Sequence, residues 1–493
     1  MSTAFIQGSQ SQLPGVEALS TFPPQPLLYG GVQQVILPTE QGPLLPGSVR
    51  DNGVMYPMAG QMGVVSQPVS PVQTQQHLVA GPGAWFGVPE DVEFGRKWGW
   101  QVGMDSYLGF ALIALFEIMI LFFYGFFARF TTQPTAFEYA TFQDINVMVM
   151  IGFGFLQVAL KGREWSSVGL SLMGAVMAVQ VYPLVGHFWR FVFADGWGGD
   201  VILDISQGSR ALFSAAAVLV SFGVLLGRLS MPQLLVLTLL EVFVFAFNEA
   251  LVLQVLGLED LGGSDYIHLF GASFGIAAAA LCGYSAFPRS GRPSSTILAF
   301  GGALFLWVYF PSFNSALALS DAERIRASMN THIALAASAL SAFAISPLLN
   351  SGRLEPVQVL HAALAGGVAI AASANWIFNP VFSVAFGCIA AIIATLAIRF
   401  LDAPLRQARL GDAIGTLGLL LLPALFGGLL SGLMVAIWFD KGTRSASAQG
   451  GIQVACTFIS LGVGAVAGAV VGLIVRFIPR SQPVNHSATW VFE

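Results

Sequence analysis

The chain has 493 residues, of which 55% are hydrophobic and only 10% are charged. Globular domains carry roughly 25% charged residues, so this composition excludes an ordinary soluble protein and indicates one that lies in a lipid bilayer. The 21 basic residues form no cluster and are outnumbered by 26 acidic ones, so nucleic-acid binding is not expected. The three cysteines lie in apolar runs without metal-ligand spacing, which predicts packing roles and neither a disulfide framework nor a metal site.

Residues 1–100 differ from the rest of the chain in composition. They are rich in Pro, Gln, Gly and Ser, carry few charges and contain no long apolar run, which is typical of a disordered tail. They also lack the basic start and apolar centre of a signal peptide, so we expect a cytosolic tail that is not cleaved. Residues 104–476 are predicted to form the membrane domain, and residues 477–493 a short cytosolic carboxyl-terminal tail.

Apolar stretches separated by short polar breaks fill the membrane domain. Each is long enough, as a helix, to cross a hydrocarbon layer of about 30 Å. The expected fold is therefore all-α, a polytopic bundle of about twelve transmembrane helices. The predicted spans are 104–130, 144–160, 166–189, 206–227, 231–256, 266–287, 297–319, 328–348, 356–376, 380–400, 412–437 and 453–476.

The distribution of basic residues predicts the orientation of these spans. If residues 1–100 are cytosolic, thirteen Lys and Arg residues near the spans fall on the cytosolic side and six on the other. Because cytosolic loops carry the excess of Lys and Arg, both termini are expected in the cytosol, and the sequon at Asn485 should stay unglycosylated. Glycines in the later spans, among them Gly366, Gly367, Gly427 and Gly468, predict close approach of helix backbones.

Ionisable residues in the spans are the functional candidates, because a charge at the centre of a membrane helix costs about 2.5 kcal/mol or more. No Ser-His-Asp arrangement, HExxH motif, phosphate-binding glycine loop or CxxC pair accompanies them, so we expect neither an enzyme nor a bound cofactor or metal. The candidates within spans or near their ends are Asp105, Glu117, Asp144, His187, Arg210, Glu241, Glu249, His268, His332, His361 and Asp412.

Most of these candidates have a structural interpretation. Glu241 and Glu249 are expected to join helices through bonds to backbone or Ser/Thr groups. Arg210, near the end of its span, is expected to reach the acidic loop at 195–204. A lone membrane histidine such as His268 is more often a hydrogen-bonding bridge between helices than a ligand. The neighbours of His268 nevertheless point to a more specific interpretation.

Seven motifs, in order along 104–475, resemble the ammonium transporter and Rhesus (Rh) glycoprotein family, and specifically its Rh branch. Their order over that length is more specific than any one of them, and none lies in residues 1–100. The motifs are FQDINVMVMIGFGFLQ at 142–157, SSVG at 166–169, NEA at 248–250, GGSDYIHLFGASFG at 262–275, LFLWVYFPSFNSA at 304–316, LAGGVA at 364–369 and DAIG at 412–415.

The resemblance implies a homotrimer in the plasma membrane, in which each protomer has a narrow hydrophobic pore for ammonia and, in some members, carbon dioxide. Family members have two facing histidines midway along the pore, and the first of these falls on His268. The phenylalanine gate at the outer mouth falls on Phe153 and Phe213, with Phe313 as a further lining candidate. The acid of the outer vestibule falls on Asp260.

Two positions depart from the family pattern. The second pore histidine should lie eight residues after Asp412, where the chain has Leu420. The acid before the gate should precede Phe213, where the chain has Leu212, and Arg210 nearby has the wrong charge to attract a cation. Neutral ammonia or carbon dioxide needs neither group, so its passage should survive these changes better than ammonium recruitment.

Three functional readings remain open. The first is an Rh-type channel for ammonia, with ammonium or carbon dioxide as further cargo. The second is a non-conducting Rh-like scaffold that has lost the pore chemistry and anchors partners of the tail. The third is an unrelated secondary transporter of about twelve spans, although the sequence shows no half-repeat. His361 is a candidate for a displaced partner of His268.

Overall fold

The computed structural model describes residues 104–131, 138–159, 164–193, 199–283, 293–408, 410, 415–438 and 444–478. The predicted tail at 1–100, Asp412, Asn485 and most of 477–493 lie outside these residues. The helices are α1 (Met104–Phe127), α2 (Glu138–Val147), α3 (Gly154–Leu156), α4 (Glu164–Phe193), α5 (Ile205–Leu225), α6 (Met231–Glu249), α7 (Phe270–Leu281), α8 (Pro293–Ser315), α9 (Asp321–Leu349), α10 (Pro356–Ile370), α11 (Pro380–Gln407), α12 (Leu422–Trp438) and α13 (Ala446–Arg476).

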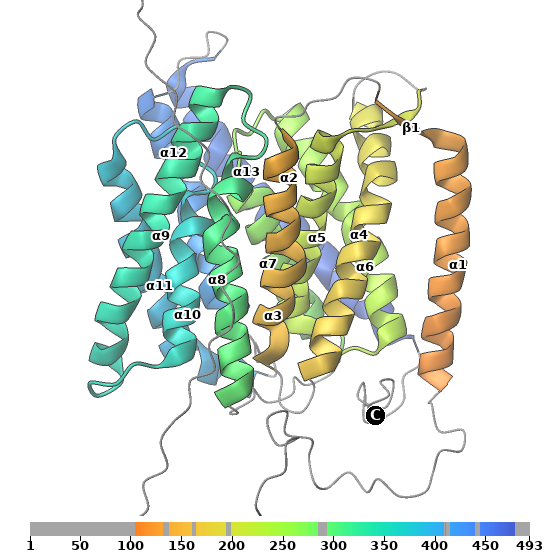
Figure 1. Ribbon diagram of the computed structural model, residues 1–493, viewed down its shortest axis with the longest axis horizontal. Coiled ribbons are helices and arrows are strands. Elements are labelled where there is room, and N and C mark those ends of the chain that lie inside the picture. The colour runs from red at the N-terminus through yellow and green to blue at the C-terminus, as the bar shows by residue number, and fades with distance from the viewer. Residues whose placement is uncertain are drawn as a thin grey trace, which may run out of the picture. The chain divides into compact units, whose positions relative to one another are not determined.

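The expected all-α bundle is confirmed. In the described part of the chain, twelve helical passes correspond to the predicted spans, with α2 and α3 forming one pass (Figure 1). Ten of these have the length and apolarity needed to cross a membrane. The other two are the pass that ends in α7 and the shorter helix α10.

Several passes contain π-helical segments, which rotate the side chains that follow relative to those before. These segments cover Met148–Phe153, Ala250–Val255, Ser264–Leu269 and Leu417–Leu421. Such segments occur frequently at functional sites. The pattern of apolar residues does not reveal them, because a fully apolar helix gives no period to read.

Helix ends differ from the predictions where polar groups stop or start a helix. The span expected over 356–376 ends at Ile370, because the backbone after it bonds elsewhere: Ala372 N–H donates to Ser264 Oγ at 2.9 Å, and Gly262 N–H to the Ala371 carbonyl at 3.1 Å. Helix α9 begins at Asp321 and not at 328, because Ser320 caps its polar first turn. Hydropathy alone misses both ends.

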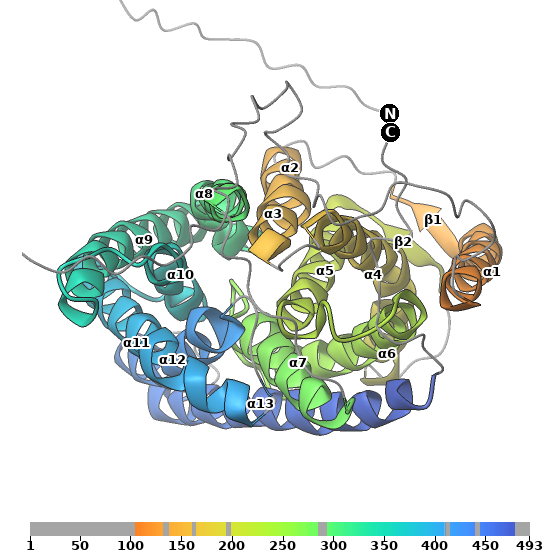
Figure 2. The ribbon, with the colours of Figure 1, turned by 90° about the horizontal axis from the view of Figure 1, so that it is seen from below.

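The predicted close packing of glycines is confirmed for most of the positions named. A Cβ atom at Gly468 of α13 would lie 2.2 Å from the Phe274 carbonyl oxygen of α7. One at Gly427 of α12 would lie 2.0 Å from the Ala369 carbonyl oxygen of α10. Figure 2 shows α13 running along one side of the bundle, where it packs against α6, α7 and α12. Small residues thus allow backbone contact between helices from both halves of the chain.

A short parallel sheet lies at one end of the bundle. Strand β1 (Ala128–Phe130) follows α1, and β2 (Val201–Leu203) leads into α5. We refer to this end, where α4 ends and α5 begins, as the upper end, as drawn in Figure 1. Arg129 Nε of β1 lies 3.5 Å from Asp200 Oδ2 beside β2, so an ion pair accompanies the sheet.

Candidate functional site

His268 lies in the π-helical segment Ser264–Leu269 that leads into α7. Gly263, which precedes the segment, has a φ of +76°, and a Cβ atom there would lie 2.2 Å from Ile267 Cδ1. Only glycine therefore suits this turn. The Asp260 carboxylate accepts backbone N–H bonds from Gly263, Ser264 and Asp265 at 2.8, 3.0 and 2.8 Å. The turn and the carboxylate together fix where the helix with His268 begins.

Aromatic rings surround the His268 imidazole. It is fully buried, and its ring centroid lies 5.8 Å from that of Phe310 and 5.8 Å from that of Phe313. Neither ring nitrogen has a hydrogen-bond partner in the described part of the chain. Because a bridging histidine would bond to a neighbouring helix, the structure does not support the helix-bridging interpretation. The imidazole instead presents two polar atoms to an apolar surrounding.

A pair of phenylalanine rings lies next to His268. Phe213 of α5 packs against Phe313 of α8, with ring centroids 4.6 Å apart, and both rings are fully buried. Phe153, the expected partner of Phe213, is buried at the end of the π-helical segment Met148–Phe153, which packs against α5 and α8. Phe213 and Phe313 are thus in direct ring contact, and the gate role expected for Phe153 stays a prediction. Phe310, one helical turn from Phe313, completes the cluster and was not singled out from the sequence, although WVYFPSF places both on one helix face.

The two leucines at departing positions are buried. Leu212 is 2% exposed and directly precedes Phe213. Leu420 is 4% exposed and lies in the π-helical segment Leu417–Leu421, which packs against the segment that contains His268. Both positions are thus apolar sites in or beside the His268 cluster. Neither offers a proton acceptor or a negative charge.

Asp260 does not occupy an open vestibule. Its side chain is 5% exposed and is committed to the backbone N–H groups described above. Desolvation by burial raises the pKa of Asp260. The hydrogen bonds that its carboxylate accepts from backbone N–H groups lower this pKa and so offset part of the rise. The expectation of a vestibule acid here is therefore corrected. The carboxylate acts on the position of His268 through the backbone.

Arg210 and Glu249 form an ion pair with each other. Arg210 Nη1 lies 2.7 Å from Glu249 Oε1, and the Tyr182 hydroxyl donates to the other carboxylate oxygen. The partners expected for both residues are wrong. Arg210 does not bond to the described part of the loop at 195–204. Glu249 bonds to side chains of α4 and α5, and not to backbone or Ser/Thr groups. The pair lies one helical turn above Phe213 and neutralises a carboxylate there.

The remaining candidates make other contacts; Asp144, for example, accepts a hydrogen bond from Ser312 Oγ, next to Phe313, at 2.7 Å. Glu241 Oε2 accepts from Ser221 Oγ at 2.7 Å, so it joins α6 to α5 through a serine as predicted. His361 lies beside Gly415, where a Cβ atom would come within 2.7 Å of its Nδ1. His332 is exposed on α9 and contacts Trp307 of α8. None of these has a ring contact with His268 in the described residues.

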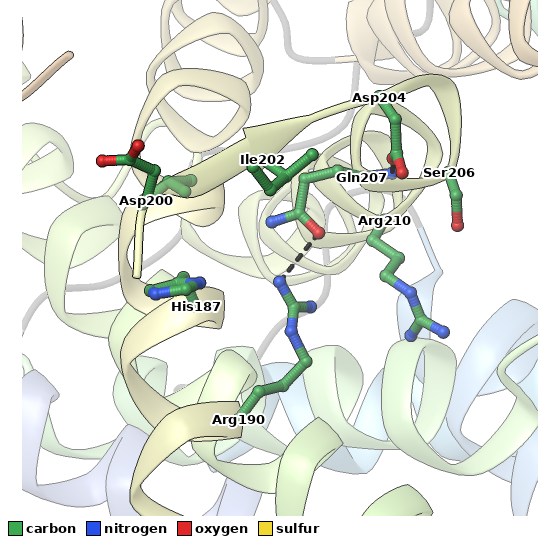
Figure 3. A pocket seen from close by; sticks show the side chains of 9 residues that line it. His187, Arg190, Asp200, Ile202, Asp204, Ser206, Gln207 and Arg210 are labelled. Carbon is green, nitrogen blue, oxygen red and sulfur yellow. Dashed lines mark hydrogen bonds between the residues drawn. The ribbon is translucent and has the colours of Figure 1, made fainter. Parts of the chain in front are cut away.

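A cavity of about 310 Å³ lies at the upper end, and Arg210 is part of its lining (Figure 3). Arg190 of α4 enters it from below and donates to Gln207 Oε1 at 2.8 Å. His187 and Arg210 are candidates from the sequence, but the cavity itself cannot be predicted from it, because the lining comes from the end of α4, from β2 and from the first turns of α5. It is lined by His187, Arg190, Asp200, Val201, Ile202, Asp204, Ser206, Gln207 and Arg210.

Comparison with known proteins assigns the family. The sequence model of the Ammonium Transporter Family matches residues 107–485. The chain belongs to this family. It is 36% identical to the dog (Canis lupus familiaris) ammonium transporter Rh type A over 76% of this chain and 93% of the relative, and 35% identical to human (Homo sapiens) Rh type B over 72% and 82%.

Solved structures support the same family fold. The Rh50 channel of Nitrosomonas europaea matches with a TM-score of 0.62 and 28% identity, over 70% of this chain and 89% of that one. The Mep2 protein of Candida albicans matches with a TM-score of 0.57 and 18% identity, over 69% and 83%, which supports the fold alone. The family identified from the seven motifs is therefore confirmed.

The cap formed by Asp260 can be tested by substitution. Asp260→Ala leaves the N–H groups of Gly263 and Ser264 without their acceptor, which should lower the free energy of unfolding by about 1–3 kcal/mol. Asp260→Asn keeps one acceptor oxygen and should recover much of that loss. Thermal unfolding of the purified protein in detergent measures both. Equal melting temperatures for Asp260→Ala and the wild type would contradict the cap.

Proposed function

We propose that the chain is an Rh-type membrane channel that passes ammonia along the His268 cluster. One observation carries this proposal: a fully buried imidazole whose two nitrogens have no protein partner in the described residues lies among phenylalanine rings. A neutral imidazole offers one donor and one acceptor, and ammonia can use both. The family membership of the chain supports the same cargo.

The chemistry of the site favours the neutral gas over the cation. Moving an isolated ammonium ion from water into an apolar surrounding costs several kcal/mol of free energy, even after the protein relaxes. Leu212 and Leu420 provide no charge or base to offset that cost, and Glu249 is already paired with Arg210. Ammonia therefore crosses as the neutral species, and carbon dioxide is a second neutral cargo that this lining would admit.

The assembly and orientation follow from the resemblance and the charge bias. Three copies would associate in the plasma membrane, each with its own path, and both termini would face the cytosol. The upper end would then face outward, with Phe213 and Phe313 as the gate nearest that side. The apolar faces of the bundle, such as the exposed Phe243 and Val466, would contact lipid or a neighbouring copy.

The imidazole should set the rate of passage. His268→Leu keeps apolar bulk and removes both polar atoms, so ammonia flux into proteoliposomes should fall about fivefold, as expected for one lost hydrogen bond of about 1 kcal/mol. Stopped-flow recording of internal pH after an ammonium pulse measures the flux. His332→Ala, which removes an exposed imidazole from α9, is the control and should leave the rate unchanged. Unchanged flux in folded His268→Leu would reassign His268 to packing.

Restoring the two family side chains should restore cation handling. Leu212→Asp with Leu420→His adds an acid before Phe213 and a second imidazole beside the segment of His268. Ammonium uptake by a transport-deficient host should rise well above wild type, while carbon dioxide passage should change little. The new Asp costs about 2 kcal/mol or more if unpaired, and Arg210 nearby offsets part of this.

The control for this experiment is Leu419→His, which adds an imidazole at the adjacent buried position. It should not raise uptake. Only variants that assemble and reach the membrane are compared. If the double variant carries no more ammonium than wild type, the alignment of Leu212 and Leu420 is wrong. If neither it nor wild type passes ammonia, the non-conducting scaffold is the better account.

A further inference from the structure

The cavity at the upper end contains a guanidinium, that of Arg190, whose hydrogen-bond partners are neutral. Arg190 donates to two neutral acceptors, the Tyr182 hydroxyl at 3.2 Å and Gln207 Oε1 at 2.8 Å. No carboxylate pairs with it in the described residues. A guanidinium carries five N–H donors, so Arg190 has further N–H groups besides the two that make these contacts. Arg210 adds a second guanidinium to the lining.

The acidic groups around the cavity are engaged elsewhere. Asp204 Oδ1 accepts the Gln207 N–H at 2.6 Å and so caps α5. Asp200 pairs with Arg129 of β1, and Figure 3 shows its carboxylate turned away from Arg190. Glu249 is paired with Arg210. The half-buried charge of Arg190 is therefore the one that the described surroundings leave uncompensated.

We propose that this cavity binds a small planar oxyanion of the carboxylate type, such as formate or bicarbonate. Arg190 would hold two oxygens through its fork of N–H groups, and Arg210 and Ser206, which also line the cavity, would be further donors. The guanidinium fork matches two coplanar oxygens, whereas it matches a spherical or tetrahedral anion less well.

Two further features fit this occupant. A cavity of about 310 Å³ holds a small anion with several waters, each of which occupies about 30 Å³. The cavity also lies one helical turn above Phe213, at a mouth where the chain lacks the acid that would attract a cation. An anion site is therefore compatible with the neutral cargo proposed above, but it does not depend on conduction.

Ligand-dependent stability of the full chain in detergent tests the site directly. Melting temperature is measured at mildly alkaline pH and constant ionic strength while sodium formate or sodium bicarbonate replaces sodium chloride. A ligand that binds only the folded state raises the melting temperature with saturation. Formate and bicarbonate should both do so, whereas sodium phosphate, which is tetrahedral, should act more weakly. A response to bicarbonate alone would assign the site to that anion.

Variants separate the cavity from general electrostatics. Arg190→Gln should weaken binding by about tenfold or more, and Arg190→Lys, which keeps the charge but loses the fork, should bind at an intermediate level. Arg324→Gln removes the same charge from the upper end at α9, far from the cavity lining, and should bind as wild type does.

A second variant covers the case in which Arg190→Gln fails to fold. Ser206→Asp places a carboxylate in the cavity at the first turn of α5, where a negative charge is tolerated, and it should abolish the response. The proposal is overturned if formate and bicarbonate stabilise no more than chloride. It is also overturned if Arg324→Gln weakens the response as much as Arg190→Gln, or if Ser206→Asp leaves it intact.

Discussion

The site depends on how Asp260 and Gly263 start the helix that contains His268. The carboxylate satisfies three backbone N–H groups, and the positive φ of Gly263 turns the chain into the π-helical segment. Without these two features, the imidazole would not face Phe310 and Phe313 at 5.8 Å. A buried polar ring without hydrogen bonds lowers the stability of the fold, and favourable packing elsewhere in the protein must offset this loss, as is typical of functional sites.

The upper end contains a neutralised ion pair, whereas the surroundings of His268 are apolar. At the upper end, Arg210 neutralises Glu249, so this carboxylate exerts little net attraction on a cation. In the segment that packs against that of His268, Leu420 is a buried apolar side chain that can accept no proton. Both features agree with the proposed passage of neutral ammonia, because a path that does not attract a cation would have little need of a second imidazole to deprotonate it.

The sequence predicted the helices better than the contacts between them. Long apolar runs predict the twelve passes, and the Gly262–Gly275 motif points to His268 without any knowledge of tertiary contacts. The pairing of Phe213 with Phe313 could not be read in this way, because the two rings are a hundred positions apart and meet only through the packing of α5 on α8. The Arg210–Glu249 pair was missed for the same reason.

Charge movement during transport tests the central claim most directly. Wild-type protein in liposomes is exposed to an ammonium pulse while internal pH is followed optically and current is recorded on a solid-supported membrane. Passage of neutral ammonia predicts a protein-dependent rise in internal pH with no more charge movement than protein-free liposomes give. A sustained inward current that scales with the amount of protein would show that the cation crosses, and would contradict the account.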